Sequence, residues 1–254
     1  MLIAFVTEAG MVASAQGQAT EREQPEELHS PAVENYLLAL YDLQEERGYP
    51  TLSELASHLR HFPPSEALGT TLPSVSGMLR RLQREELVEI GKDKRARLTD
   101  RGTQAGKDVA RRHHLAECLL VDLLGVDLPD ADEEAHRLEH FISPEVLESI
   151  FQRLGQPSTC PYGRPIPDSG YIKPESPHVP LNRTISGETY CIAMLPEDDK
   201  LLVAFLAENH IVPGQVVLVK ELATYRDAVV LGINGSEISI GSRVAESIKV
   251  LPSN

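Results

Sequence analysis

The sequence is poor in cysteine and has no long apolar run, and each absence excludes a class of protein. Its three cysteines, Cys118, Cys160 and Cys191, include no C-x-x-C pair, which argues against a disulfide framework and a thiolate zinc site and fits a reducing cytoplasm. No apolar run approaches the roughly 20 residues that span a bilayer, so no membrane contact is expected. The first residues, Met1–Val6, are apolar but lack the basic n-region of a signal peptide, so no secretory signal is expected.

The length of 254 residues is sufficient for two or three small domains. Residues 1–29 have no regular pattern and are predicted to form a disordered tail, in which Met11 is an alternative start. Residues 157–183 are predicted to be an extended linker, because seven of the eighteen prolines fall between positions 157 and 180. Proline fixes φ and removes backbone donors.

Residues 30–100 show the pattern of three helices followed by a basic hairpin. The second helix begins at Thr51, with Glu54 at the spacing of a capping box. A loop rich in proline and glycine separates it from the third helix. Two strands, Leu87–Ile90 and Ala96–Leu98, then flank a turn rich in lysine and arginine. This order predicts a winged helix-turn-helix domain.

The net charge of −14 is unevenly distributed and does not argue against DNA binding. Between Ser74 and Arg112 there are eleven Lys and Arg against six Asp and Glu, a local charge of +5, which leaves −19 elsewhere. DNA responds to the local patch, because charges beyond about 10 Å are screened. The alternative to DNA contact is that the arginines of the third helix only form a solvated helix face. The candidate DNA contacts are Ser74, Ser76, Gly77, Arg80, Arg81 and Arg84 on the third helix, and Lys92, Lys94 and Arg95 in the wing.

Two segments after the winged helix place histidines and carboxylates four residues apart. Side chains at positions i and i+4 share a helix face. Two such helices packed together would bring imidazoles and carboxylates together without a thiolate, which is a ligand set for manganese or ferrous iron. The candidate ligands are His113, Glu117, Asp132, His136, Glu139 and His140.

The C-terminal residues 184–254 contain five short strand-like runs, interrupted by one helix from Asp199 to about Asn209. This pattern predicts a small barrel. The predicted strands are Thr189–Leu195, Val216–Lys220, Ala228–Ile233, Glu237–Ile240 and Ile248–Leu251.

These motifs together resemble the iron- and manganese-dependent repressors related to diphtheria toxin repressor and the manganese transport regulator. The resemblance implies a mainly α N-terminal winged helix-turn-helix (30–100), a helical metal-binding and dimerisation domain (101–156), and a small all-β SH3-like, FeoA-like barrel (184–254). The motifs that carry it lie between Ser30 and Pro167: Glu34–Leu37, Tyr41–Leu43, Val75–Leu79, Leu98–Gly102, His113–Glu117, Glu134–His140 and Pro161–Pro167.

The resemblance implies two metal ions per subunit. The first site would take His113, Glu117 and Asp132, with Glu197 reaching in from the third domain. The second would take Asn35, His136, Glu139 and His140. Iron-type members have methionine and cysteine where this chain has Asn35 and His136, so the absence of sulfur favours Mn²⁺ over the alternative, Fe²⁺. Leu38 replaces a carboxylate of the manganese type, and the stretch Phe62–Gly69 lengthens the loop before the third helix.

The predicted function is a dimeric, metal-loaded repressor of metal-uptake genes that binds double-stranded operator DNA, and not an enzyme. One rival is a zinc peptidase, because residues 136–140 fit H-x-x-E-H. Five residues are weakly specific, and this segment cannot supply a peptidase fold. Another rival is a winged-helix regulator of an organic ligand, which would leave the acidic clusters unexplained.

Overall fold

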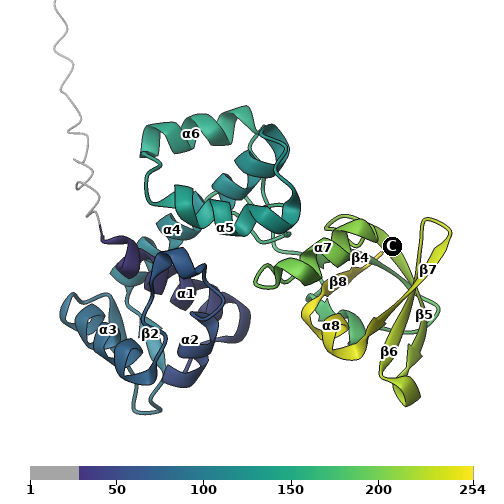
Figure 1. Cartoon of the computed structure of the whole chain (residues 1–254), viewed down its shortest axis with the longest axis horizontal. Helices are drawn as coiled ribbons and strands as arrows, with labels where there is room; N and C mark the ends of the chain where they lie inside the picture. The colour runs from purple at the N-terminus through teal and green to yellow at the C-terminus, as the bar shows by residue number, and fades with distance from the viewer. Residues whose placement is uncertain (1–28, 254) are drawn as a thin grey trace, which may run out of the picture.

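The computed structural model describes residues 29–253, which form an N-terminal helical group, a middle helical group and a C-terminal sheet (Figure 1). Residues 1–28 of the predicted tail (1–29) lie outside the described residues. No helix in residues 29–253 is both long and apolar enough to cross a membrane. The predicted fold class is confirmed by the element order.

The N-terminal group is the predicted winged helix. In α2, the Thr51 side chain accepts from the Glu54 amide, and the Glu54 carboxylate accepts from the Thr51 amide, so the capping box is confirmed. The Thr71 side chain accepts a hydrogen bond from the Ser74 amide and caps the start of α3. The elements are α1 (Pro31–Arg47), α2 (Leu52–His58), a 3-10 turn (Pro64–Glu66), α3 (Leu72–Arg84), β1 (Val88–Ile90) and β2 (Ala96–Leu98).

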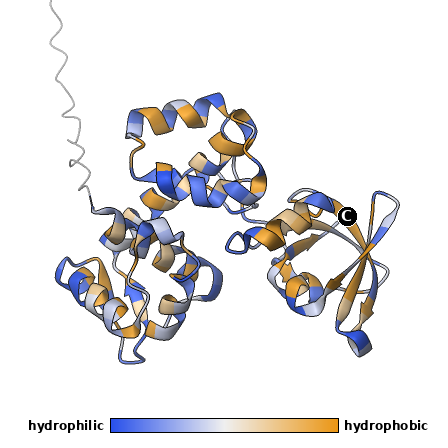
Figure 2. Ribbon diagram, viewed as in Figure 1, coloured by the Kyte–Doolittle hydropathy of each residue, from blue (hydrophilic) through white to orange (hydrophobic). Residues whose placement is uncertain are grey.

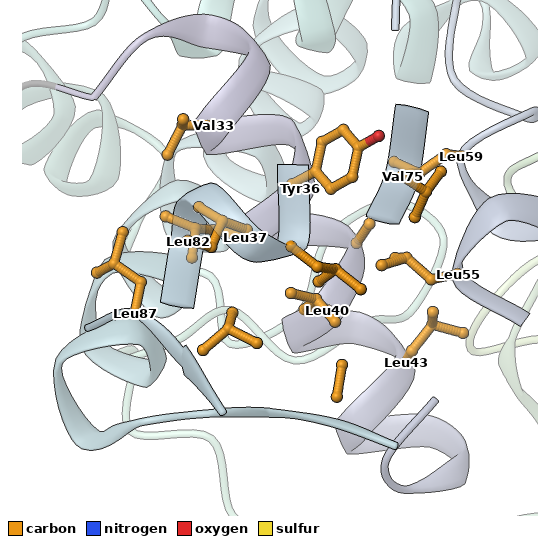
Figure 3. Packing of buried hydrophobic residues seen from close by; sticks show 14 of the residues in the cluster. Val33, Tyr36, Leu37, Leu40, Leu43, Leu55, Leu59, Val75, Leu82 and Leu87 are labelled. Atoms are coloured by element: carbon orange, nitrogen blue, oxygen red, sulfur yellow. The ribbon is translucent and has the colours of Figure 1, made fainter. Parts of the chain in front are cut away.

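The core of this group is built around one face of α1. Leu37 and Leu40 point towards Leu55 of α2 and Leu82 of α3, and all four are fully buried (Figure 3). Burying each leucine contributes about 1.5–3 kcal/mol of transfer free energy. This core fixes α1 to α3, and α1 also carries Asn35.

The middle group consists of α4 (Asp100–Cys118), α5 (Leu128–Glu139) and α6 (Pro144–Arg153). A π-helical turn, Leu119–Leu123, extends α4, and Gly125 with φ +71° follows it. α4 packs against α1 of the winged helix and against α5, so it joins the first two groups.

The proline-rich segment is only partly a linker. It lacks regular structure as predicted, but Cys160, Tyr162 and Ile166 are buried in the core that includes Leu115 of α4. The Tyr162 hydroxyl donates to the Leu128 carbonyl at 2.6 Å. Proline density fixes the backbone but says nothing about where apolar side chains between the prolines pack.

The C-terminal group is one antiparallel sheet in the order β3-β8-β4-β5-β6-β7. In the described residues β3 and β7 are edges, so the SH3-like sheet is open and not a closed barrel. Figure 2 shows hydrophobic residues along its strands. Sequence reasoning missed the short elements β3 and α8. The elements are β3 (Val179–Pro180), β4 (Thr189–Met194), α7 (Lys200–Glu208), β5 (Val216–Ala223), β6 (Ala228–Ile233), β7 (Ser236–Gly241), α8 (Ser242–Ser247) and β8 (Lys249–Pro252), with 3-10 turns at Leu181–Arg183 and Thr224–Arg226.

Gly102 allows α4 to start directly against the wing. A Cβ added there would lie 1.9 Å from the Leu87 carbonyl oxygen, which is backbone and cannot rotate away. We expect Gly102→Ala to lower the free energy of unfolding by about 1–3 kcal/mol. Gly77→Ala is the control, because nothing lies within 4 Å of its added Cβ; it should raise that free energy by about 0.5–1 kcal/mol. Urea denaturation of both variants checks this, and equal effects would contradict the packing.

Candidate metal centre

The predicted ligands of α4 and α5 converge in the interior. His113 Nε2 lies 3.3 Å from Glu117 Oε1 and 3.4 Å from Asp132 Oδ1, and its Nδ1 lies 2.6 Å from Glu139 Oε2. His136 lies 3.7 Å from the Asp132 carboxylate and 3.3 Å from that of Glu139. Because α4 and α5 pack side by side, helical spacing on each is sufficient to assemble this cluster.

The two sites implied by the resemblance are connected in this arrangement. Glu139, assigned to the second site, contacts His113 of the first site. Two groupings bring one ligand atom from each member within 4.8 Å of the others: His113 with His136 and Glu139, and His113 with Glu117 and Asp132. His113 belongs to both.

The Glu117 carboxylate is the clearest sign that the cluster is built for a cation. Both of its oxygens are buried and accept no hydrogen bond, although His113 Nε2 lies 3.3 Å from Oε1. A buried carboxylate that accepts no hydrogen bond is costly, and its charge is normally balanced by a cationic side chain or a metal ion. The nitrogen and oxygen donors around Glu117 fit a divalent ion of the manganese or iron type.

Without a metal, protons take the place of the cation. Burial lowers the pKa of His113, but the carboxylates of Glu117 and Glu139 outweigh burial and raise it well above its ordinary value. Burial raises the pKa of Glu139, but His136 and His113 outweigh this and lower it. Ligands must lose their protons before they bind metal, so an ion would replace the proton on His113.

A thiol that sequence reasoning set aside lies next to this cluster. Cys160 offers a sulfur within 4.8 Å of the ligand atoms of His114 and Glu117. Burial raises the pKa of Cys160 well above its usual range, with Glu117 adding to the effect, so the group is a neutral thiol. His114 Nδ1 lies 3.1 Å from the Pro165 carbonyl, and burial lowers the pKa of His114. His114 thus connects α4 to the proline-rich segment.

His140 lies in the adjoining part of the centre, among carboxylates that sequence reasoning missed. Its Nδ1 is 2.6 Å from Glu34 Oε2, and its Nε2 is 3.5 Å from Glu139 Oε1 and 3.6 Å from Glu66 Oε2. Asn35 donates from Nδ2 to Glu66 at 2.6 Å. Glu34 is the residue before Asn35 and lies in the same sequence motif, whereas Glu66 lies in the inserted loop.

The C-terminal group also contributes to the centre. Glu197 lines a cavity together with His113, Asp132 and His136. Its Oε2 accepts a hydrogen bond from Arg164 at 2.7 Å instead of contacting a histidine. The pKa of Glu197 is well above its usual range. Burial is the largest cause, the nearby carboxylates of Glu117 and Asp132 add to it, and together they outweigh the lowering effect of Arg164.

The predicted DNA contacts lie on α3 and the wing and differ in their availability. Arg80, Lys92 and Lys94 are exposed, and the structure gives their side chains no partner. Arg95 instead contacts Glu54 at 3.2 Å. Three of the remaining candidates contact neighbours on α3 or at its start. The Ser74 hydroxyl lies 2.8 Å from that of Thr71, Arg81 pairs with Glu85 at 2.7 Å, and Arg84 donates to the Arg80 carbonyl at 3.3 Å. Ser76 and Gly77 are half-buried.

Three family models match the chain in order and together cover most of it. Residues 29–96 match the iron dependent repressor, N-terminal DNA binding domain. Residues 99–168 match the iron dependent repressor, metal binding and dimerisation domain, and residues 179–252 match the FeoA domain. The middle match ends beyond the predicted boundary at 156 and includes the buried part of the proline-rich segment.

Individual relatives give the same result. The iron-dependent repressor IdeR of Mycobacterium tuberculosis is 36% identical over 135 residues, which are 53% of this chain, and the match spans about half, 55%, of the relative's length. A solved manganese-dependent transcriptional repressor in complex with manganese is 26% identical with a TM-score of 0.76, covering 87% of this chain and 100% of that one. The crystal structure of T. acidophilum IdeR is 26% identical with a TM-score of 0.68, covering 92% of this chain and 100% of that one.

Proposed function

This chain belongs to the diphtheria toxin repressor family of metal-dependent transcriptional repressors, and we propose that it is a Mn²⁺-activated member that binds operator DNA as a dimer and represses metal-uptake genes. The observation that carries the proposal is the buried carboxylate of Glu117, which accepts no hydrogen bond and lies within a cluster of histidines and carboxylates. The peptidase alternative is set aside, because the relatives are repressors and not enzymes.

Mn²⁺ is favoured over Fe²⁺ by the donors of this chain. The proposed ligands are imidazole nitrogens and carboxylate or amide oxygens, and the one thiol at the edge, Cys160, is held neutral by burial. Oxygen-rich sites suit manganese, whereas softer sulfur ligands select other ions. The alternative, an Fe²⁺ regulator, is supported by the iron-dependent relatives.

The fold suggests how an ion would act on DNA binding. A bound ion supplies positive charge that holds ligands from separate helices together. Asn35 lies on α1, which is embedded in the winged-helix core, and His140 follows α5. Holding these two together biases the position of the winged helix. A dimer needs its two recognition helices about 34 Å apart to enter successive major grooves.

The proposed dimer has an apolar surface available on the middle group. Phe141 is 84% exposed, and Leu123, Leu124 and Val146 are at least half exposed. Clustered exposed apolar side chains commonly mark protein interfaces. They lie within residues 99–168, the part matched by the metal binding and dimerisation model.

DNA fragments selected from a random pool by the Mn²⁺-loaded protein provide the test. We expect nanomolar-range binding of the selected duplex with Mn²⁺, as is typical of specific DNA binding. After chelation we expect a loss of about a hundredfold, within the range typical of coupling between two sites. Equal affinity after chelation would contradict the proposal. Expression of the genes beside the selected sequence, in cells fed manganese or iron alone, decides between the two metals: response to iron alone would favour the alternative.

The exposed lysines of the wing should act through phosphates. We expect the double variant Lys92→Ala and Lys94→Ala to weaken binding to every duplex and to reduce the slope of log affinity against log salt by up to about two. Arg95→Ala is a contrasting variant, because Arg95 contacts Glu54, and its slope should change less. Titrations at several salt concentrations measure the slope, and a loss limited to the selected sequence would indicate base reading instead.

A further inference from the structure

The inserted loop between α2 and α3 places a carboxylate in the metal centre. Glu66, at the end of the 3-10 turn Pro64–Glu66, has a side chain only 10% exposed. Its Oε2 lies 2.6 Å from Asn35 Nδ2 and 3.6 Å from His140 Nε2. The loop therefore adds an oxygen donor beside two residues of the second site, in a chain where Leu38 lacks a carboxylate.

Two buried polar atoms beside Glu66 have no hydrogen-bond partner. Asn35 Oδ1 belongs to a fully buried residue, and His140 Nε2 to a side chain that is 5% exposed; neither makes a hydrogen bond. If Glu66 served only to pair with Asn35, both atoms would remain unsatisfied, and each such atom is costly. A divalent ion between them would satisfy an amide oxygen, an imidazole nitrogen and a carboxylate together.

The same loop leads directly into the recognition helix. The Tyr36 hydroxyl donates to the Gly69 carbonyl at 2.9 Å, and Gly69 lies shortly before α3 begins at Leu72. At the other end of the loop, the Phe62 ring packs on His136 with 4.6 Å between ring centroids. The loop thus contacts the metal centre at Phe62 and Glu66 and is anchored to α1 just before α3.

We propose that Glu66 is a ligand of the second ion and that, through it, the inserted loop transmits metal occupancy to the recognition helix α3. The proposal rests on the proposed function, namely that this cluster binds Mn²⁺. It assigns to the insertion a direct link from the ion to the start of α3, in addition to the link through α1.

The test is a Mn²⁺ titration of the full-length protein by electron paramagnetic resonance, which measures free Mn²⁺. The parent should bind two ions per subunit. Glu66→Gln should weaken one of them by at least about tenfold to a hundredfold, since even the loss of an outer partner has that effect, and leave the other unchanged. Glu175→Gln removes the same charge from an exposed position and should bind both ions as the parent does.

The outcomes separate the two hypotheses. A parent that binds no Mn²⁺ refutes the proposed function, whereas a parent that binds two ions and a Glu66→Gln variant with the same two affinities refutes the role of Glu66. Hydrogen exchange of the parent gives a second measurement that needs no variant: Mn²⁺ should slow exchange of the amides of residues 66–72. Unchanged exchange there on full Mn²⁺ loading would overturn the link to α3.

Discussion

Replacing Glu117 by glutamine should abolish Mn²⁺-dependent DNA binding and, at the same time, stabilise the metal-free protein. Both Glu117 oxygens are buried without a hydrogen-bond partner, and a neutral amide of nearly the same shape costs less to bury than a charge. We expect the free energy of unfolding without metal to rise by about 1 kcal/mol or more. The amide is a weak ligand, so the duplex affinity with Mn²⁺ should fall to that of the chelated parent.

The control for Glu117 is Glu133→Gln on α5, where the carboxylate is 39% exposed and pairs with Arg137. It should change neither metal response nor stability by more than about 0.5 kcal/mol. Thermal unfolding with and without Mn²⁺, together with duplex titrations, measures both effects. If Glu117→Gln destabilises the metal-free protein and still responds to Mn²⁺, Glu117 is a structural residue and not a ligand.

Removing Arg164 should have the largest effect on stability. Its guanidinium, 13% exposed, pairs with Glu46 of α1 and with Glu197 of the C-terminal group, and it lies near Asp42. Burial raises the pKa of Asp42 to about 6 even with Arg164 present. Removing one partner of a buried ion pair costs about 3–5 kcal/mol, because the other charges remain buried. We expect Arg164→Ala to lower the free energy of unfolding by about that amount.

A matched surface pair provides the contrast for Arg164. Arg183 lies 3.8 Å from Glu246, and both side chains are mostly exposed, so Arg183→Ala should cost no more than about 1 kcal/mol. Urea denaturation of the metal-free variants measures both. Proteolysis should also cut the chain faster between the middle and C-terminal groups in Arg164→Ala. A similar loss in the two variants would mean that Arg164 does not join the groups.

Local patterns in the sequence predicted the fold and most of the centre, because they depend on short-range geometry. The capping box of Thr51 and Glu54 and the i, i+4 spacing of His113 and Glu117 are set within one helical turn. Packing α4 against α5 then brings His113 to Asp132 and Glu139. Helical periodicity is sufficient to predict such a cluster once the two helices are neighbours.

Contacts between distant segments could not be predicted in the same way. Glu34 is 106 residues from His140, and Glu66 is 31 residues from Asn35. No periodicity relates such pairs, and the inserted loop looked like an exposed turn because of its proline and glycine content. A lone acidic residue in that loop was the only signal for Glu66. The packing of Tyr162 was hidden for a similar reason, since proline density describes backbone and not burial.

The central claim is that Mn²⁺ binding at the buried cluster and DNA binding are coupled, and thermodynamic linkage provides its most direct test. The measurement is the Mn²⁺ affinity of the parent with and without the selected duplex. Coupling is reciprocal, so DNA must raise the affinity for Mn²⁺ by the same factor by which Mn²⁺ raises the affinity for DNA. The account predicts an increase of about a hundredfold, equal to the expected effect of chelation on DNA binding; equal Mn²⁺ affinity with and without the duplex would contradict it.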